Sequence, residues 1–189
     1  IKHRDLKSGN YPEEDEKLIE DCIYQVKNWN FTHMYMPFFD AENIYSAVKQ
    51  VHHIRPIDVL IVDYFKSTGD DKDAFQTYAS MGRCVDMVKN EIAGSMNIAA
   101  IGAAQATAYN RLADSAKIAR NASTIVMLME KEPEDIEEDG EGGGNRKMIV
   151  TFNRNGPNHS SGEWINLDFD GDRMTFGEAA SQHVPQTPY

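Results

Sequence analysis

The chain has 189 residues, of which 41% are hydrophobic and 26% charged, and its formal net charge is −11. This length suits one domain with a full core, and the composition is typical of a globular protein rather than a fibrous or disordered one. No apolar run approaches the roughly 20 residues of a membrane span, and the first ten residues lack the apolar stretch of a signal peptide. The two cysteines, far apart in sequence, indicate a reduced cytosolic protein in which both thiols are small core residues.

The acidic charge is concentrated in one segment. Residues 130–141, "EKEPEDIEEDGE", hold eight acids and one lysine and contribute −7, which leaves −4 for the rest of the chain. Nucleic-acid binding needs lysine and arginine against phosphates, so any basic surface must be local. We interpret 130–141, with the glycine-rich residues 140–145 that overlap it, as an exposed and solvated loop.

Apolar spacing in the first half of the chain predicts helices that alternate with strands. After a turn at 8–10, a proline and several acids precede apolar residues at helical spacing, as at the start of a helix. A short strand is expected over 32–39 and a helix over 40–55, with Asp40 as its N-cap. The next run, "DVLIVDYF" at 58–65, is typical of a strand buried on both faces.

The second half continues the alternation. Residues 74–96 form the longest helical pattern, 97–105 is a second apolar strand, and 123–130 is a third, with a short helix before it. Residues 146–155 and 163–176 alternate as antiparallel strands do, and a frayed tail follows them. The whole pattern predicts an α/β fold, with a mostly parallel sheet flanked by helices and a C-terminal antiparallel β-hairpin.

Two of the predicted parallel strands end on polar residues. Asp63 lies near the carboxyl end of 58–65 and Gln105 ends 97–105, and ligands of such sheets bind at the carboxyl ends of strands. A carboxylate there can hold Mg²⁺ beside nucleotide phosphates, and an amide can orient a water or sense a γ-phosphate. The simpler interpretations are a structural acid or helix cap at Asp63 and a surface-loop glutamine at Gln105.

A third polar motif is "FNRNGPN" at 152–158, which places Arg154 between two asparagines just before Gly-Pro. The pattern indicates an arginine held at the junction of a strand and a turn. A guanidinium group is suited to stabilising charge on a transferring phosphate, within its own subunit or across to another. The simpler interpretation is an ordinary surface arginine in a turn.

Taken in order, these motifs resemble the C-terminal RecA-like motor domain of DnaB-type hexameric replicative helicases. "LKSGNYPEED" is similar to the family's segment after its phosphate-binding helix, "IVDY" to its Walker B strand, "AAQ" to the strand that ends in a sensor glutamine, and "NRNGP" to its last motif. The resemblance covers residues 1–176 as a partial ATPase core and leaves 177–189 as a C-terminal tail.

The resemblance implies an ATP-driven helicase of the bacterial cytoplasm, encoded by the host or a phage. Such a protein unwinds duplex DNA by moving along single-stranded DNA as a homo-hexamer, uses ATP and Mg²⁺, and has primase or a helicase loader as a further partner. It implies no membrane association.

The resemblance also implies roles for single residues. Asp63 would be the Mg²⁺ ligand, Gln105 would couple the γ-phosphate to a DNA-binding loop, and Arg154 would be a finger that reaches the nucleotide of a neighbouring subunit. Asn155 would lie beside that nucleotide. DNA contacts are expected in the two loops that follow the strands, at Lys66, Lys72, Asn110 and Arg111.

The chain departs from the family pattern in several ways. Phe152 stands where the family commonly has a lysine, and "AQATA" replaces "SQLNR". No G-x-x-x-x-G-K-[ST] phosphate loop and no catalytic glutamate after it occur in the sequence, and in the family both precede the segment where this chain begins. We therefore expect a fragment that lacks the Walker A half and hydrolyses no ATP alone.

Two other interpretations remain open at this point. One is another RecA-like ATPase, of the recombinase or clock type, which shares the strand-end acid and glutamine. The other is a degenerate RecA-like module that is used for assembly or for binding a loader.

Overall fold

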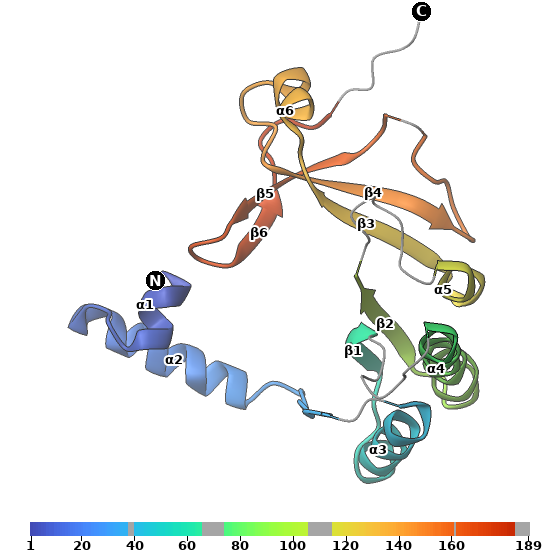
Figure 1. The fold of residues 1–189 in the computed structure, drawn as a ribbon. Helices are drawn as coiled ribbons and strands as arrows, with labels where there is room; N and C mark the ends of the chain where they lie inside the picture. The colour runs from blue at the N-terminus through green and yellow to red at the C-terminus, as the bar shows by residue number, and fades with distance from the viewer. Residues whose placement is uncertain (38–39, 66–73, 106–114, 161, 184–189) are drawn as a thin grey trace, which may run out of the picture. The chain divides into compact units, whose positions relative to one another are not determined.

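The computed structural model describes residues 1–37, 40–65, 74–105, 115–160 and 162–183, and these divide into two compact units (Figure 1). One unit is Met34–Ser123, and the other combines Ile1–His33 with Thr124–Tyr189. No helix in the described ranges is both long enough and apolar enough to cross a membrane.

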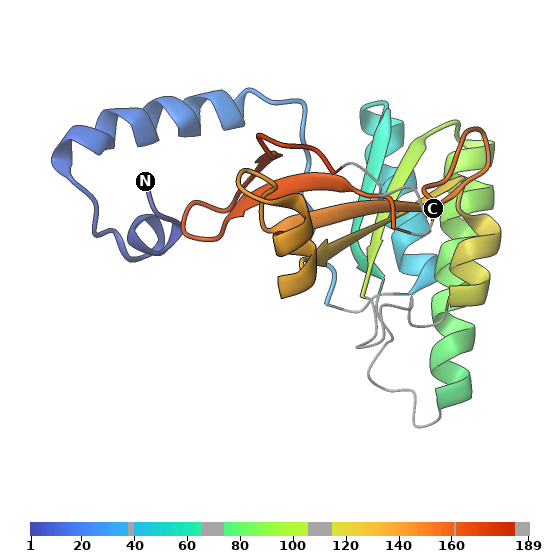
Figure 2. The same cartoon turned by 90° about the horizontal axis from the view of Figure 1, so that it is seen from above.

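A parallel pair of strands lies at the centre of the unit Met34–Ser123. β1 (Val59–Phe65) pairs with β2 (Ala99–Ala104), with Ile61 opposite Ile101. The helices of this unit are α3 (Ala41–Ile54), α4 (Ala74–Met87), the π-helix η2 (Val88–Ser95) and α5 (Ser115–Asn121), and Figure 2 shows α3 and α4 beside the two strands.

The apolar core of this unit lies between its helices and one face of the β1–β2 sheet. Side chains alternate between the two faces of a strand, so only every second residue of β1 reaches this core. The opposite face is bare, with Ile61 59% and Ile101 60% exposed. The prediction that 58–65 is buried on both faces is therefore wrong for one face. The buried cluster consists of Ala41, Ile44, Val48, Val62, Phe65, Met81, Cys84, Val85, Val88, Ile92 and Ile98.

The other unit is built on a four-stranded antiparallel sheet. Its strands follow the chain in the order β3 (Thr124–Glu130), β4 (Arg146–Asn153), β5 (Ile165–Asp170) and β6 (Thr175–Glu178). A short helix, α6 (Pro133–Asp139), lies in the connection from β3 to β4.

Three helical segments come before this sheet in the chain. They are α1 (His3–Ser8), the 3₁₀ turn η1 (Glu13–Asp15) and α2 (Glu16–Lys27). The start of α1 is tied to the β5–β6 turn, because the His3 N–H donates to the carbonyl of Asp172 at 2.7 Å. Lys2 Nζ lies 2.6 Å from the carboxylate of the same aspartate.

Local sequence signals explain where several helices begin and end. The carboxylate of Asp40 accepts a hydrogen bond from the Asn43 N–H at 2.7 Å, which confirms it as the N-cap of α3. The helix α6 begins with Pro133 behind a capping box of Glu132 and Asp135. Gly9 ends α1 at φ +72°, a left-handed conformation that glycine adopts without strain.

The predicted fold class is confirmed in part. The parallel pair β1–β2 and the antiparallel pairing of β4 with β5 are as predicted, but residues 163–176, expected as one strand, contain β5, a turn and the start of β6. β3, expected as a third parallel strand, instead pairs antiparallel with β4, and its residues alternate between exposed and half-buried. That alternation is typical of an antiparallel strand with one solvated face. The strand expected over 32–39 is absent from the described residues 32–37, and 38–39 lie outside them.

The helix predicted after the first turn is confirmed as α2, but its apolar residues are not in a core. Leu18 and Val26 are about half exposed, and Cys22 is exposed. The expectation of two buried thiols is therefore correct only for Cys84, whose pKa is raised by burial, and by nearby acids, to about 11. That thiol stays protonated at neutral pH and packs as a small apolar group.

Candidate functional site

Asp63 and Gln105 lie at the same edge of the β1–β2 sheet. Val62 pairs with Gly102 and Phe65 with Ala104, so Asp63 falls between two paired positions and Gln105 follows directly after the last one. Both residues are exposed. The two parallel strands therefore bring a carboxylate and an amide to one carboxyl edge, open to solvent, as the sequence predicted.

Asp63 is exposed, although the residues around it in the strand are apolar. The register of β1 shifts between Val62 and Phe65, so the two residues between them, Asp63 and Tyr64, are left outside the regular ladder. The peptide bond that joins them is cis. A β-bulge of this kind turns side chains away from their regular faces, and here the carboxylate reaches solvent.

The close packing of Phe65 and Gly102 supports this edge. A Cβ atom built at Gly102 would lie 2.3 Å from a ring carbon of Phe65. The ring of Phe65, which is buried, thus occupies the space that any larger residue on β2 would need. This contact holds the ends of the two strands together just below Asp63 and Gln105.

Arg154 lies in the turn that follows β4, in the unit of the antiparallel sheet, and is exposed. The side chain of Asn153 braces this turn: its Oδ1 accepts from the Asn155 N–H at 3.2 Å and its Nδ2 donates to the Pro157 carbonyl at 3.5 Å. Asn155 is exposed beside Arg154. Arg154 thus lies at the junction of a strand and a turn, as its sequence motif predicted.

A bulge in β4 lies just before this turn. Val126 pairs with Val150 and Ile125 with Phe152, so Thr151 is the extra residue. Its hydroxyl donates to the Ile125 carbonyl at 3.3 Å. Bulges of this kind redirect the strand that carries them, and this one sets the direction in which β4 enters the turn of Arg154.

The predicted site residues are divided between the two units. Asp63 and Gln105 belong to Met34–Ser123, whereas Arg154 and Asn155 belong to the other unit. The four predicted DNA-contacting residues lie outside the described ranges of the chain. These are Lys66, Lys72, Asn110 and Arg111.

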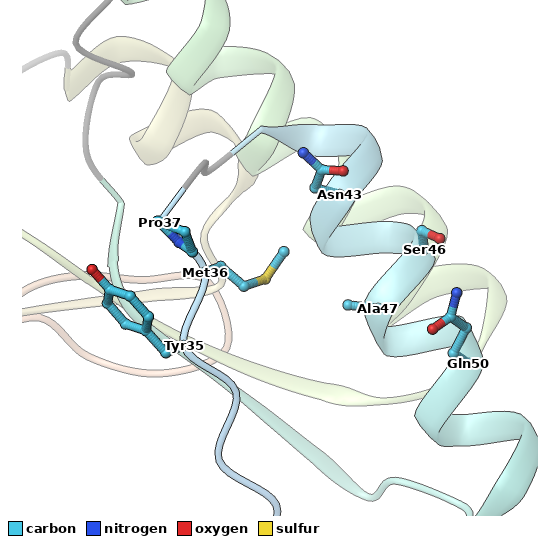
Figure 3. Close-up of a pocket in the computed structure, with 7 residues that line it drawn as sticks. All are labelled: Tyr35, Met36, Pro37, Asn43, Ser46, Ala47 and Gln50. Carbon is cyan, nitrogen blue, oxygen red and sulfur yellow. The ribbon is translucent and has the colours of Figure 1, made fainter.

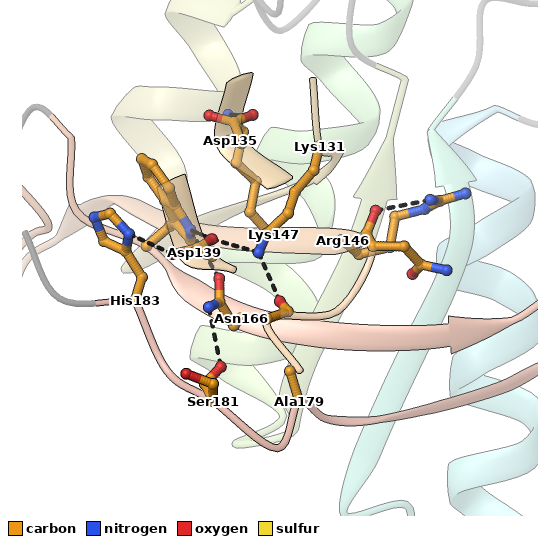
Figure 4. Close-up of polar contacts among 12 residues, drawn as sticks. Lys131, Asp135, Asp139, Arg146, Lys147, Asn166, Ala179, Ser181 and His183 are labelled. Atoms are coloured by element: carbon orange, nitrogen blue, oxygen red, sulfur yellow. Dashed lines mark hydrogen bonds and ion pairs between the residues drawn. The ribbon is translucent and has the colours of Figure 1, made fainter. Parts of the chain in front are cut away.

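A buried polar cluster is the main feature that sequence reasoning missed (Figure 4). The side chains of Lys131 and Asp139, 0% and 2% exposed, form an ion pair at 2.5 Å, and the lysine also donates to the Gly143 carbonyl at 2.6 Å. The segment 130–141 is thus not a solvated loop: it folds into α6 and turns Asp139 inward. The capping box around Pro133 was the sequence signal that would have found this helix.

The pKa of the Asp139 carboxyl is lowered from its ordinary 3.8. Burial alone would raise this pKa, but hydrogen bonds from Lys131, His183 and Trp164 outweigh it. The pKa of Asp135 is lowered too, because desolvation, which would raise it, is outweighed by hydrogen bonds, first among them the one from Lys147. Both aspartates are therefore ionised at neutral pH and neutralise the two lysines.

An open pocket of about 320 Å³ lies beside the N-terminal half of α3 (Figure 3). None of the predicted site residues lines it. Asn43, one of its polar lining groups, is already bonded to Asp40 through its side chain at 2.6 Å. The pocket therefore adds nothing to the candidate site. Its lining residues are Tyr35, Met36, Pro37, Asn43, Ser46, Ala47 and Gln50.

Solved structures of other proteins are similar to this chain, two of which are given below. No model of a protein family matches the sequence, and no curated protein does. A DnaB-like replicative helicase, described together with its interactions with primase, superposes with a TM-score of 0.72 at 15% identity. The second structure, described as an ATPase domain, superposes with a TM-score of 0.73, also at 15% identity.

These superpositions cover nearly the whole chain and only part of each solved structure. They include 93% and 94% of this chain, but 44% of the DnaB-like helicase and 66% of the ATPase domain. At this identity the likeness shows the fold. The resemblance read from the sequence is thus confirmed at the level of the fold: the chain folds like part of a DnaB-type, RecA-like ATPase domain.

Proposed function

We propose that the chain is part of an ATP-driven DNA helicase motor that moves along single-stranded DNA. The observation that carries this proposal is the placement of Asp63 and Gln105 at one carboxyl edge of a parallel strand pair. The fold likeness to a DnaB-like helicase and to a second solved ATPase domain supports it. The order of the sequence motifs, ending in "NRNGP", supports it independently.

Asp63 is the proposed ligand of Mg²⁺. Its carboxylate is exposed at the strand end, and within the described residues it makes no hydrogen bond or ion pair that would compete with a cation. A carboxylate oxygen in this position fits the oxygen coordination that Mg²⁺ requires. When bound, the metal supplies positive charge against the phosphate oxygens of ATP.

Gln105 and Arg154 act on the nucleotide in different ways. The amide of Gln105 both donates and accepts, so it can orient a water against the γ-phosphate and transmit the state of that phosphate to the loop after it. Arg154 supplies a guanidinium group to a nucleotide bound on the next subunit of a homo-hexamer, with Asn155 beside it. The brace formed by Asn153 keeps the backbone of this turn in place.

The proposed DNA contacts are Lys66 and Lys72 in one loop and Asn110 and Arg111 in the other. Lys66 comes three residues after Asp63, and Asn110 five residues after Gln105. A change at the nucleotide would therefore reach the DNA-contacting residues through short segments of the chain. Contacts to backbone phosphates would make binding weaker as salt rises. Primase or a helicase loader is the proposed further partner, since the DnaB-like helicase is described with primase.

Residues 1–189 contain no phosphate loop, so we propose that a segment outside them holds the phosphates of ATP. The chain alone should then bind ATP weakly and hydrolyse none. We suggest measuring ATP hydrolysis by the chain with Mg²⁺ and single-stranded DNA, in the wild type, Asp63→Ala and Asp58→Ala. Asp58 is the matched control, because it is an exposed aspartate just before the other end of β1. Turnover that Asp63→Ala abolishes and Asp58→Ala preserves would show that the chain holds a complete site and would contradict the proposal.

A further inference from the structure

The end of the described chain is held by a dense set of hydrogen bonds. The Ala179 N–H donates to the Asn166 carbonyl at 3.1 Å, and the Ser181 N–H donates to the Gly142 carbonyl at 2.9 Å. The side-chain amide of Asn166, fully buried, donates to the Ser181 carbonyl at 3.0 Å. We call Ala179–His183 the C-terminal strap. The sequence predicted a frayed tail over 181–189; this is wrong for residues 181–183, and 184–189 lie outside the described residues.

His183 anchors the last position of the C-terminal strap. Its side chain is 1% exposed, and its Nδ1 lies 2.7 Å from a carboxylate oxygen of Asp139. Its Nε2 lies 2.6 Å from the carbonyl oxygen of Gly162. The imidazole ring stacks on the indole of Trp164, with 3.6 Å between ring centroids and an angle of 21° between the planes.

The two partners of this imidazole are both acceptors. A carboxylate and a carbonyl oxygen have no proton to donate, so each of the two contacts needs an N–H on His183. A neutral imidazole carries one N–H and an imidazolium carries two. Both contacts are as short as charge-assisted hydrogen bonds or shorter, and the face of an indole ring attracts a cation. The geometry at Asp139, Gly162 and Trp164 therefore matches the doubly protonated ring.

Lys131 is a positive group that shares the carboxylate of Asp139 with His183. It binds the other oxygen of Asp139 at 2.5 Å, so that one carboxylate serves both cations. The ion pair is fully enclosed. Because Asp139 remains ionised through its several hydrogen bonds, its negative charge is constant over the range in which histidine titrates.

The other charged groups near the ring are held by partners of their own. Lys147 Nζ lies 4.9 Å from the centre of the Trp164 ring and pairs with Asp135 at 2.5 Å. Glu163, next to Gly162 in sequence, turns its carboxylate to the Ser160 N–H at 2.6 Å.

We infer that His183 is a proton-controlled lock of the C-terminal strap. Doubly protonated, the ring bonds Asp139 and Gly162 at the same time and fixes the strap over the cluster. When the pH rises and the ring loses a proton, one of these two bonds is lost and the strap loosens. The backbone bonds of Ala179 and Ser181 still form but open more often, so the change is a loosening and not an unfolding. This lock is independent of the proposed function.

Trp164 reports directly on the state of the lock. The chain has two tryptophans, and Trp29 is exposed, so Trp29→Phe leaves Trp164 as the single emitter. We suggest recording the emission of this variant between pH 5 and 9, together with amide exchange of the C-terminal strap corrected for intrinsic rates. We expect one transition in emission, and about tenfold lower protection of the Ser181 amide above it, the size expected for a lost hydrogen bond to a charged group.

Two further variants in the same background separate the lock from a general effect of pH. His183→Gln should abolish the emission transition and make strap protection independent of pH, while circular dichroism shows that the fold persists. Asp139→Asn, which keeps the shape but removes the negative charge, should move the transition to lower pH. Flat emission in the Trp29→Phe protein, or a transition that persists in His183→Gln or does not move in Asp139→Asn, would overturn the inference.

Discussion

Phe65 pairs with Ala104 across the parallel ladder of β1 and β2, two residues after Asp63 and one residue before Gln105. This pair closes the regular part of the small parallel sheet. It fixes the carboxylate of one strand and the amide of the next at the same edge. The proposed nucleotide chemistry depends on this edge, so its packing is the first property to test.

Gly102→Ala should destabilise the edge. The added methyl group would meet the ring of Phe65 at 2.3 Å, and overpacking of a close contact costs about 1–3 kcal/mol. Gly177→Ala on β6 is the matched control, because a Cβ there meets nothing within 4 Å. The measurement is urea unfolding of both variants, with the control within about 0.5 kcal/mol of the wild type. Equal midpoints for the two variants would contradict the packing of Phe65 on Gly102.

Lys131→Met should cost far more stability than Lys2→Met. The first change leaves the enclosed carboxylate of Asp139 without its ammonium partner, and breaking a buried ion pair costs about 3–5 kcal/mol. The second breaks the exposed pair of Lys2 with Asp172, which is worth at most about 1 kcal/mol. Free energies of unfolding from urea titrations at pH 7 compare them. Similar losses in the two variants would show that the cluster around Asp139 is solvated.

Stability should also fall on the acid side through Asp139. Its folded-state pKa lies below the ordinary 3.8, so its contribution is present above that value and is lost as the pH falls through the folded-state pKa. Thermal unfolding between pH 2 and 6 should therefore show a steep decline below about pH 4. Asp139→Asn should flatten this decline, whereas Asp168→Asn, an exposed control on β5, should not. A decline that Asp139→Asn leaves unchanged would contradict the buried ionised state.

Local sequence patterns predicted the helices and strands that depend on residues close in sequence. Helical spacing and the cap at Asp40 gave α3, and apolar runs that end in polar residues placed Asp63 and Gln105 at a strand edge. These features depend on residues a few positions apart. Their chemistry is visible in the sequence before any tertiary contact forms.

The features that the sequence did not reveal depend on distant partners. His183 meets Asp139 across 44 positions, and eight acids around one lysine looked like a solvated run. The antiparallel pairing of β3 is likewise set by β4 and not by the apolar residues of β3 itself. The roles of Arg154 and of the DNA-contacting residues stay predictions, because the first concerns a neighbouring subunit and the others lie outside the described residues.

We propose that Arg154 acts on a nucleotide of a neighbouring subunit in an ATP-driven motor. The most direct measurement is DNA-stimulated ATP hydrolysis, with unwinding of a forked duplex, by the protein that carries this chain together with a phosphate loop. Arg154→Ala should lower hydrolysis about 1,000-fold or more and abolish unwinding, as expected for a lost arginine finger. The matched control is Arg83→Ala, an exposed arginine on α4, which should leave both activities unchanged. Hydrolysis by Arg154→Ala at the level of the wild type would contradict the proposed role of Arg154 as an arginine finger.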